Sequence, residues 1–223
     1  MTGPTVRRSR RTVATPHGPA RVSLWIPPAP AGSLVLSHGA GAGAGGWTAD
    51  LSALTALAGG ERAWRVALVE QPWKVAGRRV AAPPAQLDEC WRAILPALTR
   101  GPRRLQRPLI VGGRSAGARV ACRTAASVGA DGVLALAFPL HPPGRPEASR
   151  AGELAASGVP TLVVQGRSDP FGSPEEVRAA VPGVPVVAAA GGHGFAADPG
   201  DVVAAVRAWL TREWREWTRE PGR

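Results

Sequence analysis

Short apolar runs, rich in β-branched residues and bounded by glycine or proline, recur along the chain. They cover residues 33–38, 64–70, 108–113, 132–138, 161–166 and 184–190. Continuous apolar runs of this length are typical of strands that are buried on both faces of a parallel sheet. The stretch 13–26 is more polar and is interrupted by Pro-His-Gly-Pro, so we expect one or two opening strands there.

Segments with a helical pattern lie between these runs, at residues 48–57, 85–98, 116–127, 147–157, 173–181 and 198–220. Ser173 is followed by a proline and, three residues on, by Glu176, which predicts a capped helix start. Asp198 and Pro199 open the last helix in a similar way. Strands that alternate with helices indicate the α/β class, with a mostly parallel, doubly wound sheet and helices on both faces.

The length of 223 residues suits one domain, and no repeat or linker divides the chain. We expect residues 1–11 to form a basic flexible tail and residues 12–223 a single domain. The clustered arginines near the start precede no apolar segment of a secretion signal, and no apolar run approaches the roughly 18 residues that a membrane span needs. These features predict a cytoplasmic protein without a membrane span.

The net charge of +11 raises the question of an anionic partner. All but one of the basic residues are arginines, the exception being Lys74, and they are scattered along the chain. No nucleic-acid-binding motif is present, so the charge does not predict a nucleic-acid partner. Cys90 and Cys122 lie in predicted helices without paired or metal-like spacing, and we expect two reduced thiols in the core.

The segment Gly113-Arg114-Ser115-Ala116-Gly117 fits the pattern G-x-S-x-G between a predicted strand and a predicted helix. Such a turn exposes a serine hydroxyl above the sheet edge, at the N-terminus of a helix. The alternative is a glycine-rich turn with an ordinary surface serine.

A nucleophilic serine needs a histidine base, and the base needs an acid that orients it. Asp169 follows one predicted strand and His193 follows the last one, so both should share the carboxyl edge of the sheet with Ser115. The order Ser115, Asp169, His193 is a known order of these three groups in α/β enzymes. The other histidines fit the role of the base poorly; they are His17, His38 and His141.

Backbone N–H groups would have to stabilise the oxyanion of an acyl-transfer reaction. We expect one from Ala116, directly after the serine, and a second from Ala40, with Gly41 as the next choice, in the glycine-rich loop 37–46. A phosphate-binding loop is the alternative for this loop, but the pattern G-x-x-x-x-G-K-[ST] is absent.

The chain resembles the α/β-hydrolase superfamily in its dienelactone-hydrolase-like branch. More narrowly, it is similar to the predicted hydrolases that include testis-expressed protein 30 and a subunit of the nonspecific-lethal chromatin complex. The blocks that carry this resemblance are "LSHGAGAG", "QPWKVAGRRVAAPP", "GGRSAGAR", "FPLHPPGRPE" and "LVVQGRSDPFGSPEE". The resemblance implies an α/β-hydrolase fold and Ser115, Asp169 and His193 as the catalytic triad. Serine stands where dienelactone hydrolases have cysteine, so their lactone chemistry is not implied.

These features predict a serine hydrolase that cleaves a carboxylic ester, a thioester or a similar acyl bond, without a cofactor or metal. Two alternatives stay open: an acyltransferase with the same triad, and a catalytically silent binding or assembly module.

The segment 138–160 is too short for a substantial lid, so we expect an open site for a small acyl substrate. Its walls would be Trp73, Leu140, His141 and Phe171, with Phe195 as a further candidate.

Basic residues follow several strand ends and predict an electropositive mouth that favours anionic substrates, unless they only reflect the composition. They are Lys74, Arg78, Arg79, Arg114, Arg145 and Arg167. Trp214 and Trp217, near the end of the last helix, either fold back on the domain or form a homodimer contact.

Overall fold

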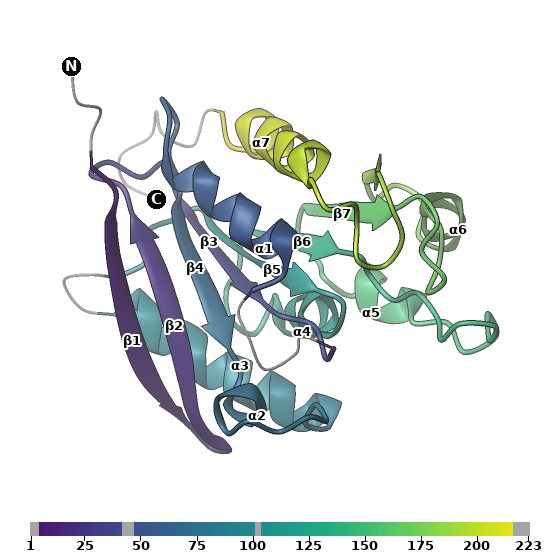
Figure 1. The fold of residues 1–223 in the computed structure, drawn as a ribbon, viewed down its shortest axis with the longest axis horizontal. Coiled ribbons are helices and arrows are strands. Elements are labelled where there is room, and N and C mark those ends of the chain that lie inside the picture. Colours follow the sequence, from purple (N-terminus) through teal and green to yellow (C-terminus); the bar gives the residue numbers. More distant parts are fainter. Residues whose placement is uncertain (1–4, 42–46, 101–103, 216–223) are drawn as a thin grey trace.

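One eight-stranded sheet forms the centre of the molecule (Figure 1). The computed structural model describes residues 5–41, 47–100 and 104–215. The strands, in chain order, are β1 (Arg7–Thr15), β2 (Gly18–Ile26), β3 (Ser33–Ser37), β4 (Arg65–Glu70), β5 (Leu109–Arg114), β6 (Gly132–Leu136), β7 (Thr161–Gly166) and β8 (Val186–Ala189). Their order across the sheet is β1-β2-β4-β3-β5-β6-β7-β8, and all neighbours are parallel except β1 with β2 and β2 with β4.

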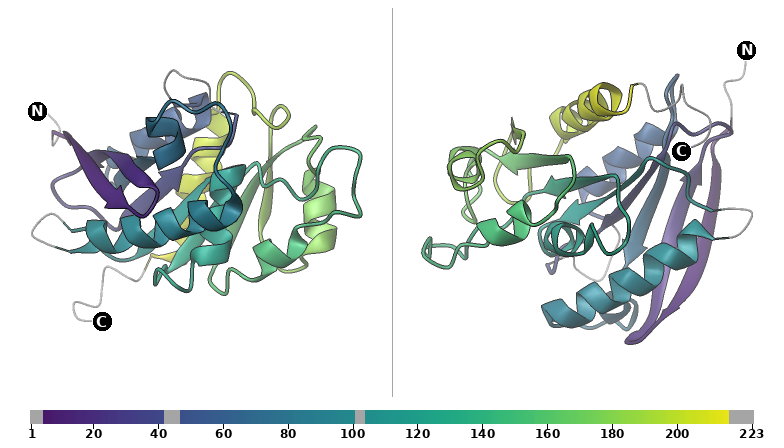
Figure 2. Two further views of the ribbon diagram at one scale, coloured as in Figure 1. Left: turned by 90° about the horizontal axis from the view of Figure 1, so that it is seen from below. Right: turned by 180° about the vertical axis from the view of Figure 1, so that it is seen from behind.

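Helices cover both faces of this sheet, as Figures 1 and 2 show. They are α1 (Ala49–Leu54), η1 (Thr55–Ala58), α2 (Pro72–Val75), α3 (Pro84–Thr99), α4 (Ala116–Thr124), α5 (Ala151–Ala155), α6 (Pro174–Ala180) and α7 (Gly200–Glu213). The apolar side chains of α1 and α7 pack with one face of the sheet, and those of α3, α4, α5 and α6 pack with the other. No described helix has the length and apolar character needed to cross a membrane.

The apolar runs of the sequence form the strands β3 to β8, and all of these except β8 lie in the interior of the sheet. The expectation of burial on both faces is wrong for residues 184–190, because β8 is an edge strand in which only Ala189 is buried. The strands β3, β6 and β7 are buried at every position, because helices cover them on both sides. The capping box at Ser173 is also present: its hydroxyl accepts a hydrogen bond from the Glu176 N–H at 3.2 Å, and the Glu176 carboxylate accepts one from the Ser173 N–H at 2.7 Å. Cys90 and Cys122 are free and buried, as expected.

The expected flexible tail is wrong for residues 7–11, which belong to β1. These residues pair with β2, from Arg7 opposite Ile26 to Arg11 opposite Val22. The sequence pattern does not indicate a strand at these residues, because β1 lies at the edge of the sheet and carries arginines instead of an apolar run. Charged residues on an edge strand hinder pairing with other chains. The first four residues of the expected tail lie outside the described residues.

Several helices are shorter than the sequence pattern predicts. The segment expected at 147–157 contains only α5, so a single five-residue helix lies between β6 and β7, and no substantial lid covers this end of the described sheet. The last helix ends at Glu213, and residues 216–220 of its expected range lie outside the described residues. The short helix α2 was not expected.

Trp214 packs on its own domain. Its side chain is buried, with its ring edge-on to Trp209 at 4.8 Å and to Trp64 at 6.3 Å between ring centroids. Gly132 lies directly beneath this ring, at the start of β6. This contact matches the expectation of a helix end that folds back on the sheet, whereas Trp217 lies outside the described residues.

Candidate active site

Three polar side chains form a series of hydrogen bonds at the carboxyl edge of the sheet. Ser115 follows β5, Asp169 follows β7, and His193 follows β8. The His193 Nε2 lies 2.9 Å from the Ser115 Oγ, and the His193 Nδ1 lies 2.8 Å from the Asp169 Oδ2. The fold therefore brings together the three residues that the sequence singles out, although 78 residues separate the first from the last.

The backbone at Ser115 is strained. Its φ of 53° lies in the left-handed region, which is unfavourable for a residue with a side chain. Gly113 and Gly117 on either side pack so closely on the Ser37 carbonyl of β3 that a Cβ at either position would overlap it. The glycines therefore let the strand turn directly into α4, and this turn holds the hydroxyl of Ser115 above the sheet edge.

The carboxylate of Asp169 is fully buried and accepts three hydrogen bonds. Its Oδ2 accepts from His193 and, at 3.0 Å, from the Gln165 Nε2, and its Oδ1 accepts from the Phe171 N–H at 2.9 Å. Gln165 is itself held by the backbone of Phe138, whose N–H donates to the Gln165 side-chain oxygen at 2.9 Å. The carboxylate is thus fixed in one orientation, with one oxygen directed at His193.

The oxyanion donors expected from the sequence lie in the segments that flank Ser115. Ala116 is the first residue of α4, where backbone N–H groups have no partner within the helix. In the loop after β3, Gly39 lies against Ser115: a Cβ at Gly39 would be 3.2 Å from the Ser115 Cβ. Ala40 follows and is exposed. Residues 42–46 of this loop lie outside the described residues.

His38 orients the peptide between Gly39 and Ala40. Its Nδ1 lies 2.9 Å from the Gly39 carbonyl oxygen, and its Nε2 accepts a hydrogen bond from the Gln71 N–H at 3.0 Å. An accepting Nε2 leaves the proton on Nδ1, so His38 donates to the Gly39 carbonyl. Because the carbonyl and the following N–H point in opposite directions in a trans peptide, this bond also sets the direction of the Ala40 N–H.

The pKa of His38 is lowered to about 4, mainly by burial and to a smaller extent by the nearby charge of Lys74, while the hydrogen bond to Gly39 has an opposing effect. His38 is therefore neutral at neutral pH. In an unfolded chain the imidazole has its ordinary pKa near 6.5, so the unfolded state binds the proton more readily between these two values.

We predict a stability loss on acidification that depends on His38. The neutral His38 imidazole makes its full contribution to the free energy of unfolding above pH 6.5, and this contribution is lost as the pH falls towards 4. The free energy of unfolding should therefore decrease by about 2 kcal/mol between pH 7 and pH 5 because of this residue. Urea unfolding of the wild type and of His38→Gln at both pH values measures this difference. His17→Gln, at an exposed histidine, is the matched control. An equal acid-induced decrease in the free energy of unfolding of the wild type and of His38→Gln would disprove the prediction that His38 is buried in its neutral form.

The expected pocket residues have different environments. Trp73 lines a cavity of about 330 Å³ between α2, α3 and the β1–β2 turn, and also a void of about 10 Å³ that touches Ala116. The centre of the Phe171 ring lies 4.3 Å from the centre of the His193 ring. Leu140 and His141 are buried, and His141 contacts the Pro142 carbonyl at 2.9 Å and the Glu176 carboxylate at 3.4 Å. Phe171 thus lies against the ring of His193, and Trp73 shares a void with Ala116.

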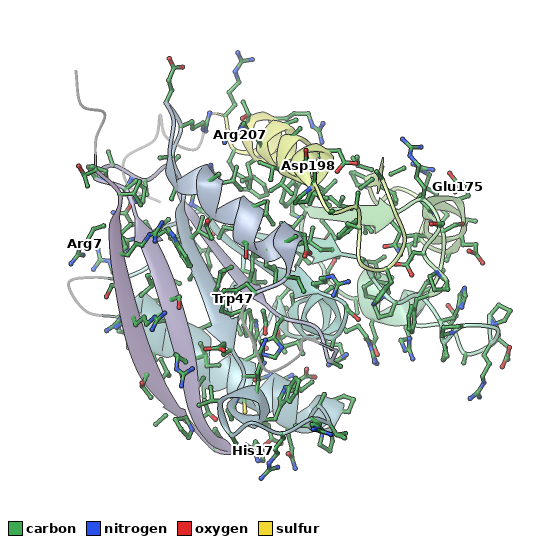
Figure 3. The ribbon with its side chains drawn as sticks, in the orientation of Figure 1. Arg7, His17, Trp47, Glu175, Asp198 and Arg207 are labelled. Carbon is green, nitrogen blue, oxygen red and sulfur yellow. The ribbon has the colours of Figure 1, made fainter. Side chains whose placement is uncertain are left out.

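The basic residues expected at the mouth do not act as one group. Arg114 turns inwards and donates to the His193 carbonyl oxygen, with its Nε 3.6 Å from the Asp50 Oδ2. Arg145 lies 3.4 Å from Glu147 in an exposed ion pair. The Lys74 Nζ lies 5.6 Å from the centre of the ring of Trp47, a residue that is labelled in Figure 3. The centre of the same ring lies 6.3 Å from the centre of the His38 ring. Lys74 thus lies beside Trp47, near the end of the loop after β3, while Arg114 lies against Gly39 at the start of that loop.

Sequence reasoning missed the contacts of Gln165, His38 and Arg114. Each had a weak signal. Gln165 is a polar residue within a run that is otherwise apolar, and His38 directly follows a fully buried strand. Arg114 was interpreted as a mouth residue because the sequence shows that it follows a strand but not where its long side chain turns. No group of three or more histidine, cysteine, aspartate or glutamate side chains suited to a metal ion occurs among the described residues.

Known proteins of similar structure share this architecture. A dienelactone hydrolase from Anabaena variabilis has a TM-score of 0.69 at 19% identity, over 94% of this chain and 96% of that chain. An esterase from Pyrococcus furiosus has a TM-score of 0.68 at 16% identity, over 93% and 91%. A serine hydrolase without a lid, from Xanthomonas campestris, has a TM-score of 0.66 at 19% identity, over 95% of both chains. At these identities the likeness establishes the fold, and the expected α/β-hydrolase fold is confirmed.

Among curated protein sequences, none matches the chain. Residues 30–198, well over half of the chain, match the family model described as an alpha/beta hydrolase domain. The chain therefore belongs to the alpha/beta hydrolase domain family.

Proposed function

We propose that the protein is a serine hydrolase that cleaves a carboxylic ester, a thioester or a similar acyl bond through an acyl-enzyme. The observation that carries this proposal is the series of hydrogen bonds from Ser115 through His193 to Asp169, at 2.9 and 2.8 Å. A serine hydroxyl, an imidazole and a buried carboxylate in this order are the groups that nucleophilic acyl transfer needs.

In the proposed reaction the Ser115 Oγ attacks the acyl carbonyl carbon, while its proton passes to the His193 Nε2. Asp169 keeps the other imidazole proton on Nδ1 and stabilises the positive charge that forms. The N–H groups of Ala116 and Ala40 stabilise the oxyanion. His193 then donates the proton to the leaving group. Water attacks the acyl-enzyme with His193 again as the base, and His193 passes the water proton to the Ser115 Oγ as the bond between Oγ and the acyl carbon breaks and the acid is released. None of these steps uses a cofactor or metal.

The narrower relationship to the predicted hydrolases that include testis-expressed protein 30 is also a proposal. Its support is the position of the sequence blocks: "GGRSAGAR" spans the turn into α4, and "LVVQGRSDPFGSPEE" runs from β7 through Asp169 into α6. These blocks coincide with the segments that carry the site, where a shared chemistry would leave a shared sequence.

Two further expectations stay predictions of the sequence: a cytoplasmic location and a homodimer through the last helix. The large apolar side chains that are exposed in the described part of the chain are Val80 and Val187, neither of which lies on α7. The described part of α7 thus offers little apolar surface to a second copy.

We expect short, anionic acyl substrates to be the best ones. The short β6–β7 connection leaves room for small substrates, and Lys74 beside the loop after β3 is a positive charge that can attract an anion. A panel of nitrophenyl esters with graded chain lengths tests this expectation, with a succinate monoester and its neutral methyl ester as the matched pair. The anionic ester should have the higher kcat/KM at low salt, by roughly 10-fold or more, and should lose this advantage as salt is added.

Equal rates and equal salt dependence for the matched pair would show that the basic residues reflect composition alone. Activation by emulsified long-chain triglyceride would contradict the expected open, small-substrate site. Rapid labelling of Ser115 without release of the acyl group to water would instead favour an acyltransferase.

A further inference from the structure

A mostly buried arginine, Arg114, and a buried aspartate, Asp50, lie near the loop that carries His193, and the proposed reaction uses neither. Arg114 is the last residue of β5, directly before Ser115, and Asp50 lies in the first turn of α1. Their side chains are 11% and 1% exposed, and the Arg114 Nε lies 3.6 Å from the Asp50 Oδ2. They form an ion pair between the sheet and the helix that covers it.

The guanidinium group of Arg114 contacts two loops of the site. Its Nη2 donates a hydrogen bond to the His193 carbonyl oxygen, and a Cβ at Gly194 would lie 3.9 Å from the same nitrogen. On its other side, a Cβ at Gly39 would lie 3.8 Å from Nη1. One planar group therefore spans the loop of the proposed base and the loop of the proposed oxyanion donor.

The His193 loop depends on such external contacts, because three of the residues from 191 to 194 are glycines. Backbone N–H groups bind the carbonyl oxygens of the preceding residues. Ala196 donates to Ala190 at 2.9 Å, Ser168 to Gly191 at 3.1 Å, and Phe195 to Gly192 at 3.0 Å. The carbonyl of His193, in contrast, is bound by the side chain of Arg114. A hydrogen bond from a charged donor is stronger than one from a neutral N–H, so Arg114 is well suited to hold this part of the loop.

Asp50 stabilises Arg114 through charge. Both oxygens of its carboxylate and the Arg114 Nε are buried, and none of these atoms makes a hydrogen bond to the described residues. The electrostatic attraction at 3.6 Å is thus what the carboxylate contributes to the guanidinium. A buried charge that loses its partner is strongly unfavourable, so each member of the pair depends on the other.

We propose that Arg114, held in place by Asp50, is a positioning residue that keeps His193 aligned with Ser115 and Asp169. It does not touch the substrate. The inference rests on the proposed hydrolase function, and it assigns a role to the variable position before the serine in the G-x-S-x-G turn.

Arg114→Gln, Arg114→Lys, Asp50→Asn and the double variant Asp50→Asn/Arg114→Gln test this role with a short ester substrate. Arg114→Gln should lower kcat by about 10- to 100-fold and leave KM within about threefold, because a small displacement of a catalytic group is enough for such a loss. Arg114→Lys retains a charged donor and should recover part of kcat. The double variant should lose no more activity than Arg114→Gln, because Asp50 acts only through Arg114.

The matched control is Arg123→Gln. Arg123 forms ion pairs with Asp88 at 2.7 Å and with Glu153 at 2.8 Å, and the side chains of Arg123 and Asp88 are 19% and 11% exposed. These ion pairs join α4 to α3 and α5 and involve none of the three site residues. This variant should lose stability and keep kcat. Additive losses in the double variant, a loss confined to KM, or an equal kcat loss in Arg123→Gln would overturn the proposal.

Hydrogen exchange of residues 190–197 provides a readout that does not need activity. Exchange in this segment should accelerate in Arg114→Gln and Asp50→Asn but not in Arg123→Gln; unchanged exchange would refute the positioning role. If the wild type neither hydrolyses esters nor reacts with a fluorophosphonate, the proposed function fails, and the exchange experiment still decides whether Arg114 holds the loop.

Discussion

Ser115→Ala is expected to abolish hydrolysis of activated esters, with a decrease in kcat of at least about 10⁴-fold. The alanine removes the Oγ that lies 2.9 Å from the His193 Nε2 and with it the proposed nucleophile. The backbone of the turn should be retained, because Gly113 and Gly117 make the contacts with Ser37 that shape it. Labelling by a fluorophosphonate probe, read as a mass increase on the peptide containing Ser115, should disappear together with hydrolysis.

Ser52→Ala is the matched control, since Ser52 is an exposed serine on α1. This variant should keep both activity and labelling. If a folded wild-type protein neither hydrolyses any ester of the panel nor reacts with the probe, the hydrolase proposal is wrong, and a binding or assembly role becomes the better interpretation.

Asp169→Asn is expected to lower kcat by about 10³- to 10⁴-fold while His193 and Ser115 remain in place. Three donors point at the carboxylate: the His193 Nδ1–H and the Gln165 Nε2 at one oxygen, and the Phe171 N–H at the other. An asparagine has only one oxygen, so its NH₂ group must face at least one donor. If it faces His193, the imidazole proton moves to Nε2, which then cannot accept the proton of Ser115.

The same substitution should lower the unfolding free energy by about 1–3 kcal/mol, because a buried donor loses its acceptor. Kinetics and urea unfolding measure the two effects separately. Asp198→Asn is the control, at the exposed aspartate labelled in Figure 3 that accepts a hydrogen bond from the Gly200 N–H at 3.0 Å. It should leave kcat unchanged. Wild-type kcat in a folded Asp169→Asn variant would exclude this carboxylate from the mechanism.

The interior of the sheet could be predicted because burial on both faces demands apolar residues at every position. The strand β6 is an example, with each residue apolar and buried from Gly132 to Leu136. The edge strand β1 could not be predicted in this way. Its arginines point largely to solvent, and its pairing with β2 rests on backbone hydrogen bonds, which almost any residue can form.

Helix ends were less predictable than strands for a related reason. The pattern 147–157 contains residues that suit a helix, yet only Ala151–Ala155 is helical. The backbone N–H of Arg150 instead donates to the Leu140 carbonyl at 2.7 Å, which ties the start of this segment to an earlier part of the same β6–β7 connection. Such a contact depends on where the loop lies, and no local pattern records it.

The sequence by itself determined the strand–helix alternation, the strained serine turn and the positions of Ser115, Asp169 and His193 after three different strands. Local rules suffice for this, because apolar runs, glycines and strand ends are features of neighbouring residues. The order of strands, with β5 beside β6, β6 beside β7 and β7 beside β8, then decided that these strand ends lie close together along the shared carboxyl edge.

Only the tertiary structure decided how the residues of the site and its loops are held. Gln165 reaches Asp169, His38 reaches the Gly39 carbonyl, and Arg114 reaches the His193 carbonyl across 79 residues of sequence. Long polar side chains have several rotamers of similar energy, and the partner that becomes available in the folded chain selects one of them. That is why Arg114 could be predicted to lie at the site edge, while its inward direction and its pairing with Asp50 required the folded structure.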